Sequence, residues 1–559
     1  MKSPINDIEL HQNNRLYWCL FFLPIAGIFF LSWLFFIPLP IYDYWDVLSA
    51  GLHLHERTVL EQLRFYWEPF VDQKMVFPKL LIVYLAKATR NNHYWLEILF
   101  GLLGQISVLA IVAYLIKMLR HFTQKTQAAL ILTSSFLLFW PILLVRFQHH
   151  WYSTQYTFVL VFAALSILFI IRFWGTWAGI FLSLIFGIFS AVSHGTGLIY
   201  LLSYMVALAL ASGWSKSQKL LSCACSLGII LFIAAEMPER ASLYLPPLNW
   251  FTEKPLRELI FILRCFAPEG VLRTQTGFLT LAFGLFACGI LLVRRELLSR
   301  QYFAWVLIFF WGCCVAGISG ITRSSFARYP AGIYFSFFIL VLIAVIVLSV
   351  VVYPHSPLKD KKINWRFAGT VLIILYIVGA VEGIRQAASS QRKVFWSRER
   401  LQFQPILVKS DYRWLFPFET FPQKIIDLNA AKMLDAVDSR PFIMNHGVTF
   451  KKQSEGREIC YIPDRALSPD EVITFPVNEV TSLSARCYWT ADTNWYEEQS
   501  ESLQMRPVNG DYWVIFRNKA KPGFSKPIRK IKLVLPDNLK PRDIDTLPEP
   551  TVWHRKTTS

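Results

Sequence analysis

The chain has 559 residues, of which 54% are hydrophobic and only 17% are charged, yet its formal net charge is +18. Soluble domains carry roughly 25% charged residues, and a soluble globule could not bury this much apolar surface. The composition excludes a disordered chain, a collagen-like chain and a disulfide scaffold. It predicts an all-α bundle that crosses the lipid bilayer several times.

Long apolar stretches predict about eleven transmembrane helices, each near the length needed to cross roughly 30 Å of hydrocarbon. The expected spans are residues 17–39, 95–116, 127–145, 155–173, 177–193, 197–213, 219–236, 276–293, 301–320, 331–353 and 367–384. The stretch 193–197 contains two glycines, so the span at 177–193 is the weakest, and this segment is alternatively a broken or re-entrant pair. We expect the first span to be a transmembrane helix and not a cleaved signal peptide, because Asp7 and Glu9 precede it and no small-residue cleavage site follows.

The basic residues between the spans indicate the orientation of the bundle. If the N-terminus is cytoplasmic, the short inner loops hold thirteen basic residues and only two acids, Glu296 and Asp360. Most other acids of the membrane part lie in the outer loops. The positive charge is therefore a topology signal, and no nucleic-acid partner is expected. The C-terminal part contains no Asn-x-Ser/Thr acceptor, which favours a bacterial inner membrane.

The composition changes near residue 385 and divides the chain into two parts. Residues 1–384 are expected to form the transmembrane domain, with a long first outer loop at 40–94, and residues 385–559 a small mixed α/β domain outside the cytoplasm. In the latter a helix is predicted over 424–437 and strands over 512–516 and 531–535. Cys460 and Cys487 would form a disulfide in an oxidising compartment, or remain two thiols.

The first outer loop begins with two carboxylates, Asp43 and Asp46, among interfacial aromatic residues. At this low-dielectric edge either one could act as a general base toward a hydroxyl group. The alternative is a helix cap with a solvated loop acid. An amphipathic helix is predicted over Val47–Glu68, lying in the plane of the interface. The apolar stretch Val76–Ala86 is too short to span, so we expect it to dip into the membrane or pack against the bundle.

The segments YDYWD at 42–46, FVDQKMVFPKLL at 70–81 and ARYP at 327–330, together with the predicted architecture, resemble the GT-C superfamily of integral-membrane glycosyltransferases. The resemblance covers the architecture of nearly the whole chain, but few motifs carry it. It implies a polyprenyl-phosphate-linked sugar as donor and a first-loop acid that acts on the acceptor. The acids of this chain are separated by Tyr44 and Trp45 rather than adjacent, which leaves open whether Asp43 or Asp46 is the base.

The resemblance also implies that basic residues at the outer membrane edge hold the lipid phosphate. Arginine suits this role because its planar fork matches phosphate oxygens. The candidate substrate-binding residues, all predicted on the outer side, are Arg146, His149, His150, His194, Arg323, Arg328 and Tyr329. For the cations, the alternative is snorkelling or an ordinary loop position.

The sequence supports no particular cofactor. It has no Walker A sequence and no dinucleotide fingerprint, and the pair His149-His150 lacks the spacing of a metal-binding helix. A divalent metal held by these histidines, His194 and nearby acids is a weak alternative.

The predicted function is the transfer of a sugar from a polyprenyl phosphate to a hydroxyl on a lipid, glycan or protein acceptor, outside the cytoplasm. The first alternative is a transporter or flippase for a lipid-linked glycan, which would need charges deep inside the spans. The second is an O-antigen-type ligase or polymerase, which would use the late-loop arginines instead of a first-loop aspartate.

Overall fold

The computed structural model describes the chain in segments. In the helical part these are residues 5–36, 47–48, 50–51, 53–70, 73–89, 93–148, 150–236, 255–267, 273–294, 296, 299–323, 335–353 and 377–391. In the C-terminal part they are residues 442–444, 449–455, 458–464, 472–476, 485–490, 503–505, 512–515, 530–534 and 551–555. The chain divides into two compact units: residues 1–40 with 50–391, here called the helical unit, and residues 41–49 with 392–559.

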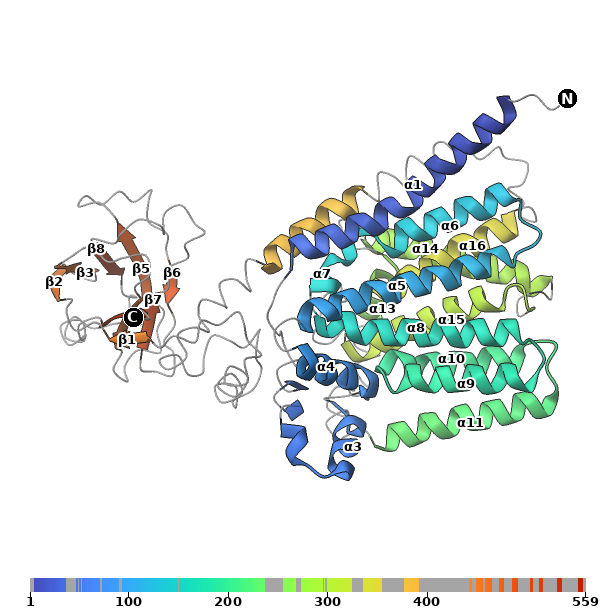
Figure 1. Ribbon diagram of the computed structural model, residues 1–559, viewed down its shortest axis with the longest axis horizontal. Coiled ribbons are helices and arrows are strands. Elements are labelled where there is room, and N and C mark those ends of the chain that lie inside the picture. The colour runs from blue at the N-terminus through green and yellow to red at the C-terminus, as the bar shows by residue number, and fades with distance from the viewer. Residues whose placement is uncertain are drawn as a thin grey trace. The chain divides into compact units, whose positions relative to one another are not determined.

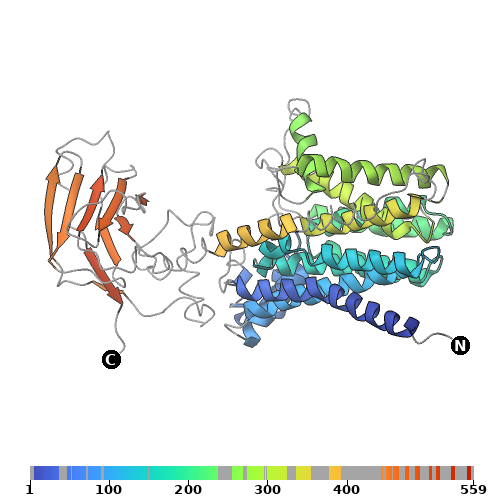
Figure 2. The same ribbon diagram turned by 90° about the horizontal axis from the view of Figure 1, so that it is seen from above.

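The helical unit is a bundle of long helices that run side by side (Figures 1 and 2). Its elements are α1 (Ile5–Leu34), η1 (His53–Glu56), α3 (Val59–Trp67), α4 (Val76–Thr89), α5 (His93–Lys117), α6 (Gln124–Leu138), η3 (Pro141–Leu143), α7 (Leu144–Gln148), α8 (His150–Arg172), α9 (Trp177–Ala191), α10 (Gly195–Leu210), α11 (Lys216–Ala235), α13 (Pro255–Cys265), α14 (Arg273–Val293), α15 (Phe303–Arg323) and α16 (Phe335–Val352). Residues 377–391 form a further helix.

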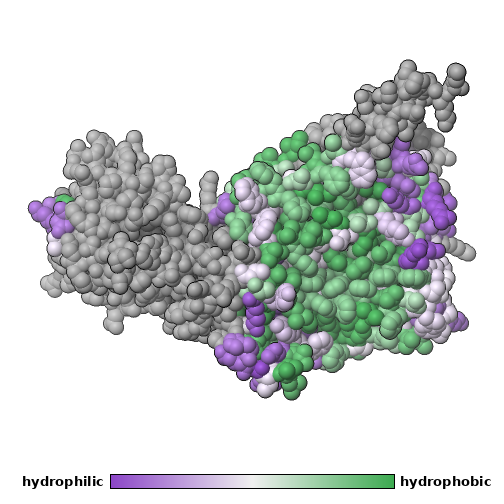
Figure 3. Space-filling view, in the orientation of Figure 1, coloured by the Kyte–Doolittle hydropathy of each residue, from purple (hydrophilic) through white to green (hydrophobic). Residues whose placement is uncertain are grey.

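Seven of these helices are long and apolar enough to cross a bilayer: α1, α5, α6 extended to Leu143, α8, α11, α14 and α15. Three more, α9, α10 and α16, are apolar but shorter. This arrangement confirms a helical bundle of the membrane type, whereas the count of eleven spans stays a prediction. Large apolar side chains such as Phe22, Leu231 and Val293 are more than half exposed, as expected of a lipid-facing surface. Figure 3 shows hydrophobic residues covering one face of this unit.

The helix ends follow the local chemistry of the sequence. Three helices begin at a side-chain cap in which Thr123, Thr176 or Ser215 accepts a hydrogen bond from a backbone amide two or three residues into the helix. The pair α9 and α10 corresponds to the weakest predicted span and its neighbour. With 15 and 16 residues, each helix reaches only about 24 Å at 1.5 Å per residue. Two separate helices agree with the two predicted spans and with the alternative of a broken or re-entrant pair, and the choice between these stays a prediction.

The segment predicted as the first outer loop, residues 40–94, keeps that name here, and its described part differs from the prediction of one helix over Val47–Glu68. A short 3-10 helix, η1, ends at Glu56, and α3 begins after Thr58. The Thr58 hydroxyl accepts from the amide of Glu61 at 3.3 Å, and the Thr58 amide donates to the Glu61 carboxylate at 2.8 Å. This capping box starts a new helix and explains why a continuous one does not form. The later apolar stretch forms α4, which packs against the bundle, one of the two predicted alternatives.

The described strands of the second unit, all within residues 442–555, form two antiparallel sheets. The strands are β1 (Phe442–Met444), β2 (Phe450–Glu455), β3 (Glu458–Pro463), β4 (Val472–Pro476), β5 (Ala485–Thr490), β6 (Leu503–Met505), β7 (Tyr512–Ile515), β8 (Lys530–Val534) and β9 (Thr551–Arg555). One sheet has the order β1-β9-β4-β7 and the other β2-β3-β8-β5-β6. The two predicted strands are β7 and β8, while the helix predicted over 424–437 lies outside the described residues. A mixed α/β domain therefore stays a prediction.

The register of the second sheet settles the alternative between a disulfide and free thiols. Cys460 on β3 pairs with Lys532 of β8, and Cys487 on β5 pairs with Leu533 of the same strand. Because β8 lies between them, the two cysteines are two strand spacings apart, about 9 to 10 Å, whereas a disulfide needs Cα atoms within about 7 Å. Cys460 is a free thiol, and the disulfide alternative is wrong.

Candidate functional site

Buried charged side chains gather at one end of the helical unit. This end, here called the α7 end, carries α3, α4, α7, α13 and the turn between α9 and α10 (Figure 1). All buried charged side chains that the structure describes lie in segments at this end: Lys74, Lys79, Glu97, Arg146, Glu258 and Arg273. Elsewhere the core of the bundle is mainly aliphatic and aromatic. Since a buried charge is costly without a partner or a task, the α7 end is the candidate functional site.

Arg146 is one of the most deeply enclosed cations of this end, with 1% of its surface exposed. Its guanidinium donates to Gln105 Oε1 at 3.3 Å and to Thr157 Oγ1 at 3.1 Å. It also lies over the rings of Phe147 and Tyr156, with its Cζ 5.3 and 5.8 Å from the ring centroids. No carboxylate pairs with it among the described residues. Arg146 is thus a buried positive charge held by neutral groups, which suits a site for an anion.

The position of Arg146 follows from a break in the third apolar stretch. Pro141 has no amide hydrogen to donate and its ring disfavours a continuous helix, so α6 ends at Leu138 and a 3-10 turn precedes the five-residue helix α7. Gln148, at the end of α7, donates to the carbonyls of Phe35 and Ala387 at 3.0 and 2.9 Å. These bonds connect α7 to the end of α1 and to the helix at 377–391, so α7 is held in place from two sides.

Several polar atoms around α7 and the first turn of α8 are buried without a hydrogen-bond partner among the residues that the structure describes. They are Arg146 Nε, Gln148 Oε1, Ser153 Oγ and Gln155 Oε1. Buried polar atoms are nearly always satisfied by protein or by ordered water. These atoms are therefore placed to bond ordered water or a polar group beyond the described residues.

His194 lies beside this cluster, at the turn between α9 and α10. It caps α10: its Nδ1 accepts from the Thr196 amide at 3.1 Å. In the neutral ring the proton is therefore on Nε2, which is a donor. The His194 ring packs edge-on against Tyr156, with centroids 5.1 Å apart, and Tyr156 also contacts Arg146. The structure thus brings together two predicted site residues, Arg146 and His194, around one tyrosine.

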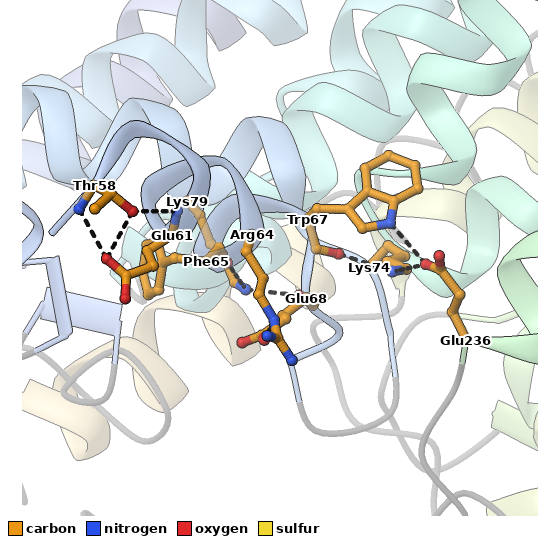
Figure 4. Close-up of polar contacts among 9 residues, drawn as sticks. All are labelled: Thr58, Glu61, Arg64, Phe65, Trp67, Glu68, Lys74, Lys79 and Glu236. Atoms are coloured by element: carbon orange, nitrogen blue, oxygen red, sulfur yellow. Dashed lines mark hydrogen bonds and ion pairs between the residues drawn. The ribbon is translucent and has the colours of Figure 1, made fainter.

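Two buried lysines of the first outer loop form a second group at this end (Figure 4). Lys74 forms a close ion pair with Glu236, at the end of α11, and donates to the carbonyl of Trp67 at 2.8 Å. Its ammonium lies 4.6 Å from the centroid of the Trp67 ring, and Trp67 Nε1 also donates to Glu236 at 2.7 Å. The hydrogen bond from Lys74 holds the pKa of Glu236 below its usual range. This pair connects the first outer loop to α11.

Lys79, the second lysine, closes the C-terminal end of α3. It donates to the carbonyls of Phe65 and Glu68 at 2.9 and 2.8 Å, where a cation also interacts favourably with the helix dipole. Its ammonium lies 5.0 Å from the Phe65 ring centroid. Burial lowers the pKa of Lys79 to about 8, although the Glu68 carboxylate acts in the opposite direction. The two lysines thereby fix α3, whose apolar residues Val59, Leu60 and Leu63 remain exposed.

The segment between α3 and α4 is also bonded to the turn between α9 and α10. The Val76 amide donates to the Val192 carbonyl at 2.8 Å, and Gln73 Oε1 accepts from the Gly195 amide at 3.2 Å. Because His194 lies within this turn, the same contacts hold the first outer loop next to the cluster around Arg146.

Only part of the predicted site can be placed. Asp43, Asp46, His149, Arg328 and Tyr329 lie outside the described residues, as do the side chains of His150 and Arg323. Arg146 and His194 are described, and they meet at Tyr156 rather than standing as separate loop cations. The alternative of snorkelling does not apply to Arg146, because its guanidinium is enclosed by protein.

Sequence reasoning missed Lys74, Lys79 and Tyr156 as members of this end. The sequence does contain a signal for Lys79, because this residue interrupts an otherwise apolar stretch, VFPKLLIVYLA. An unpaired ammonium would be unfavourable there. No three His, Cys, Asp or Glu residues gather as a metal site within the described part of the chain, and the metal alternative involving His149 and His150 is not tested by it.

Comparison with known proteins identifies no relative. No protein-family model, no curated protein and no solved structure matches the chain. The structure on its own establishes a helical bundle of the membrane type, in which the buried charged side chains of the described residues gather at one end.

Proposed function

We propose that the protein is an integral-membrane glycosyltransferase of the GT-C type. It transfers a sugar from a polyprenyl phosphate to a hydroxyl acceptor on the extracytoplasmic side of the membrane. The observation that carries the proposal is that all buried charged side chains among the described residues lie at the α7 end. By the distribution of basic residues in the loops, this end faces away from the cytoplasm.

Arg146 supports a phosphate-bearing substrate. Its guanidinium is buried without a carboxylate among the described residues, so the charge of a phosphate would compensate it. Its Nε and the neighbouring Gln148 and Gln155 oxygens have no described partner and could bind further polar groups of the substrate. Arg323 and Arg328 of the late outer loop remain additional candidates for the phosphate, and His194 offers its Nε2 hydrogen as a donor.

The proposed reaction inverts the configuration of the transferred sugar. Asp43 or Asp46 accepts the proton of the acceptor hydroxyl, and the oxygen forms a bond to the anomeric carbon. The bond between that carbon and the phosphate oxygen breaks, and its electron pair leaves with the polyprenyl phosphate. The developing negative charge on the phosphate is stabilised by arginine.

The transporter alternative is less consistent with the position of the charges. A path for a charged headgroup needs polar or charged side chains along the whole bundle. The described buried charges occupy one end only, and the buried polar residues further along are neutral, for example the hydrogen-bonded group Ser166, Ser183 and Tyr200. The ligase or polymerase alternative shares the donor and differs in not needing the first-loop aspartates.

The test uses the full-length protein in nanodiscs with polyprenyl-phosphate mannose and polyprenyl-phosphate glucose, each labelled in the sugar. Transfer of label to a membrane-extract acceptor is measured for the wild type and for Asp43→Asn, Asp46→Asn and Arg146→Gln. We expect one aspartate variant to lose at least about a hundredfold in rate, as for removal of a general base. Arg146→Gln should lose a similar factor, as for removal of a group that stabilises transition-state charge.

The matched controls are Glu56→Gln, an exposed acid of the same loop, and Arg64→Gln, an exposed arginine of α3. Both should retain wild-type rates. If neither Asp43→Asn nor Asp46→Asn slows transfer in a well-folded protein, the first-loop base is wrong and the ligase or polymerase alternative gains. If the donor crosses the bilayer with its sugar–phosphate bond intact, the protein is a transporter.

A further inference from the structure

A pocket opens at the end of the helical unit opposite the α7 end. It has a volume of about 270 Å³ and lies where the C-terminal ends of α5 and α8 meet the beginning of α15. Its polar lining is Arg120, Arg300 and Gln301, and its apolar lining includes Met118, Ile171 and the fully buried Trp305. A water molecule occupies about 30 Å³ in the liquid, so the pocket has room for a small polar headgroup.

The two arginines of this pocket are solvent-exposed cations at the same end of the helical unit. Arg300 Nε donates to the Ile171 carbonyl at 3.1 Å, and no ion pair to either arginine occurs within the described part of the chain. Of the two acids in the inner loops, Glu296 pairs with Arg294 at 3.6 Å, and Asp360 lies outside the described residues. The anchored Arg300 guanidinium keeps its terminal nitrogens for an anion.

We propose that this pocket binds a phosphate group, and that its source is the headgroup of an anionic phospholipid of the inner leaflet. The apolar lining beside the arginines favours a lipid over a free ion, because the first carbons of a lipid can contact Met118 and Ile171. Basic pockets between membrane helices on the cytoplasmic side are a recurrent way to hold such headgroups. This site is at the other end of the bundle from the proposed transfer reaction and does not depend on it.

The experiment measures lipid binding to the full-length, purified protein. Native mass spectrometry counts retained phosphatidylglycerol for the wild type and for the double variant Arg120→Gln/Arg300→Gln, with phosphatidylcholine as the neutral comparison. Thermal stability is measured in parallel with added phosphatidylglycerol and with added inorganic phosphate. The matched control is Lys125→Gln/Lys216→Gln, which removes two exposed charges from the same end without changing the pocket.

We expect the pocket variant to bind phosphatidylglycerol at least about tenfold more weakly, from the contribution of basic residues near anionic lipid, and the control to bind as the wild type does. A second variant, Met118→Trp, fills the pocket and keeps both arginines, so it should lose binding as well. If inorganic phosphate, but not phosphatidylglycerol, stabilises the wild type and does not stabilise the pocket variant, the pocket is an anion site whose phosphate comes from a soluble compound. Equal phosphatidylglycerol retention by the pocket variant, Met118→Trp and the control would overturn the proposal.

Discussion

At the scale of single residues, the ion pair of Lys74 and Glu236 is asymmetric. Lys74 is 1% exposed, whereas the Glu236 side chain is 33% exposed. Removing the acid would leave a buried ammonium with only the Trp67 carbonyl and ring, while removing the lysine would leave a carboxylate that water can reach. The consequences for stability should therefore differ strongly between the two partners.

We expect Glu236→Gln to lower the free energy of unfolding by about 2 to 3 kcal/mol and Lys74→Met by about 1 kcal/mol or less. The double variant should recover most of the loss caused by Glu236→Gln. Melting temperatures in detergent would rank the variants, with Glu68→Gln, which breaks an exposed ion pair with Arg64, as the control near wild type. A larger loss for Lys74→Met than for Glu236→Gln would contradict this account.

Lys79 should make stability depend on pH in the alkaline range. Its pKa is about 8 in the folded protein and about 10.4 in the unfolded chain, so between these values the unfolded state binds more protons. The free energy of unfolding then rises with pH for the wild type, and Lys79→Met lacks this term. The stability of the wild type relative to Lys79→Met should increase by about 2 kcal/mol from pH 7.5 to 9.5.

Melting temperatures of both proteins at the two pH values would measure this change. Lys87→Met, on the exposed side of the same helix α4, is the control, and its gap to the wild type should not change. If the stability of the wild type relative to Lys79→Met stays constant or falls between pH 7.5 and 9.5, the buried ammonium is not the origin of the pH dependence.

At the scale of elements, the short helices α9 and α10 approach each other very closely at Gly197. A Cβ atom at this position would lie 2.0 Å from the Ser190 carbonyl oxygen, a backbone atom that cannot move without separating the two helices. In contrast, a Cβ at Gly228 in α11 would meet nothing within 4 Å. The two positions form a matched pair for testing whether the α9–α10 hairpin is rigid.

Gly197→Ala should destabilise the protein by about 1 to 2 kcal/mol, since overpacking costs more than the gain in helix propensity. It should also shift His194, and with it the rate of the proposed transfer. Gly228→Ala should leave stability unchanged or raise it by up to about 1 kcal/mol. Melting temperature and activity of the two variants, measured together, would check both statements. Equal behaviour of the two variants would show that the hairpin can adjust.

The elements also show which features the sequence can predict. Long apolar stretches located the membrane helices, because an uncharged helix of about 20 residues has one favourable environment. Hydropathy did not predict the helix break before Thr58 or the turn at Pro141. Both depend on a local cap or a proline, to which hydropathy is insensitive. The site is harder still: Arg146, Tyr156 and His194 meet only through the packing of α7, α8 and α10, and no sequence spacing connects them.

At the scale of the whole molecule, the two ends of the helical unit differ in kind. The α7 end holds buried charges that are bonded into the fold, while the opposite end holds exposed basic residues in short loops. The loop residues were predicted as a topology signal, and their distribution can be read from the sequence alone. The buried charged residues could not be identified from the sequence, because burial depends on how the helices pack. Arg146 and Arg120 both follow an apolar stretch, yet Arg146 is buried and Arg120 is exposed.

The gathering of buried charge at one end has an electrical consequence. Moving one elementary charge across the whole membrane at 100 mV involves about 2.3 kcal/mol. Charge that is rearranged only at the α7 end would cross a small fraction of that field, since the described residues along the remaining length of the bundle include no buried charged side chain. The membrane potential would therefore neither drive nor oppose chemistry at this end, which would proceed equally in energised and de-energised membranes.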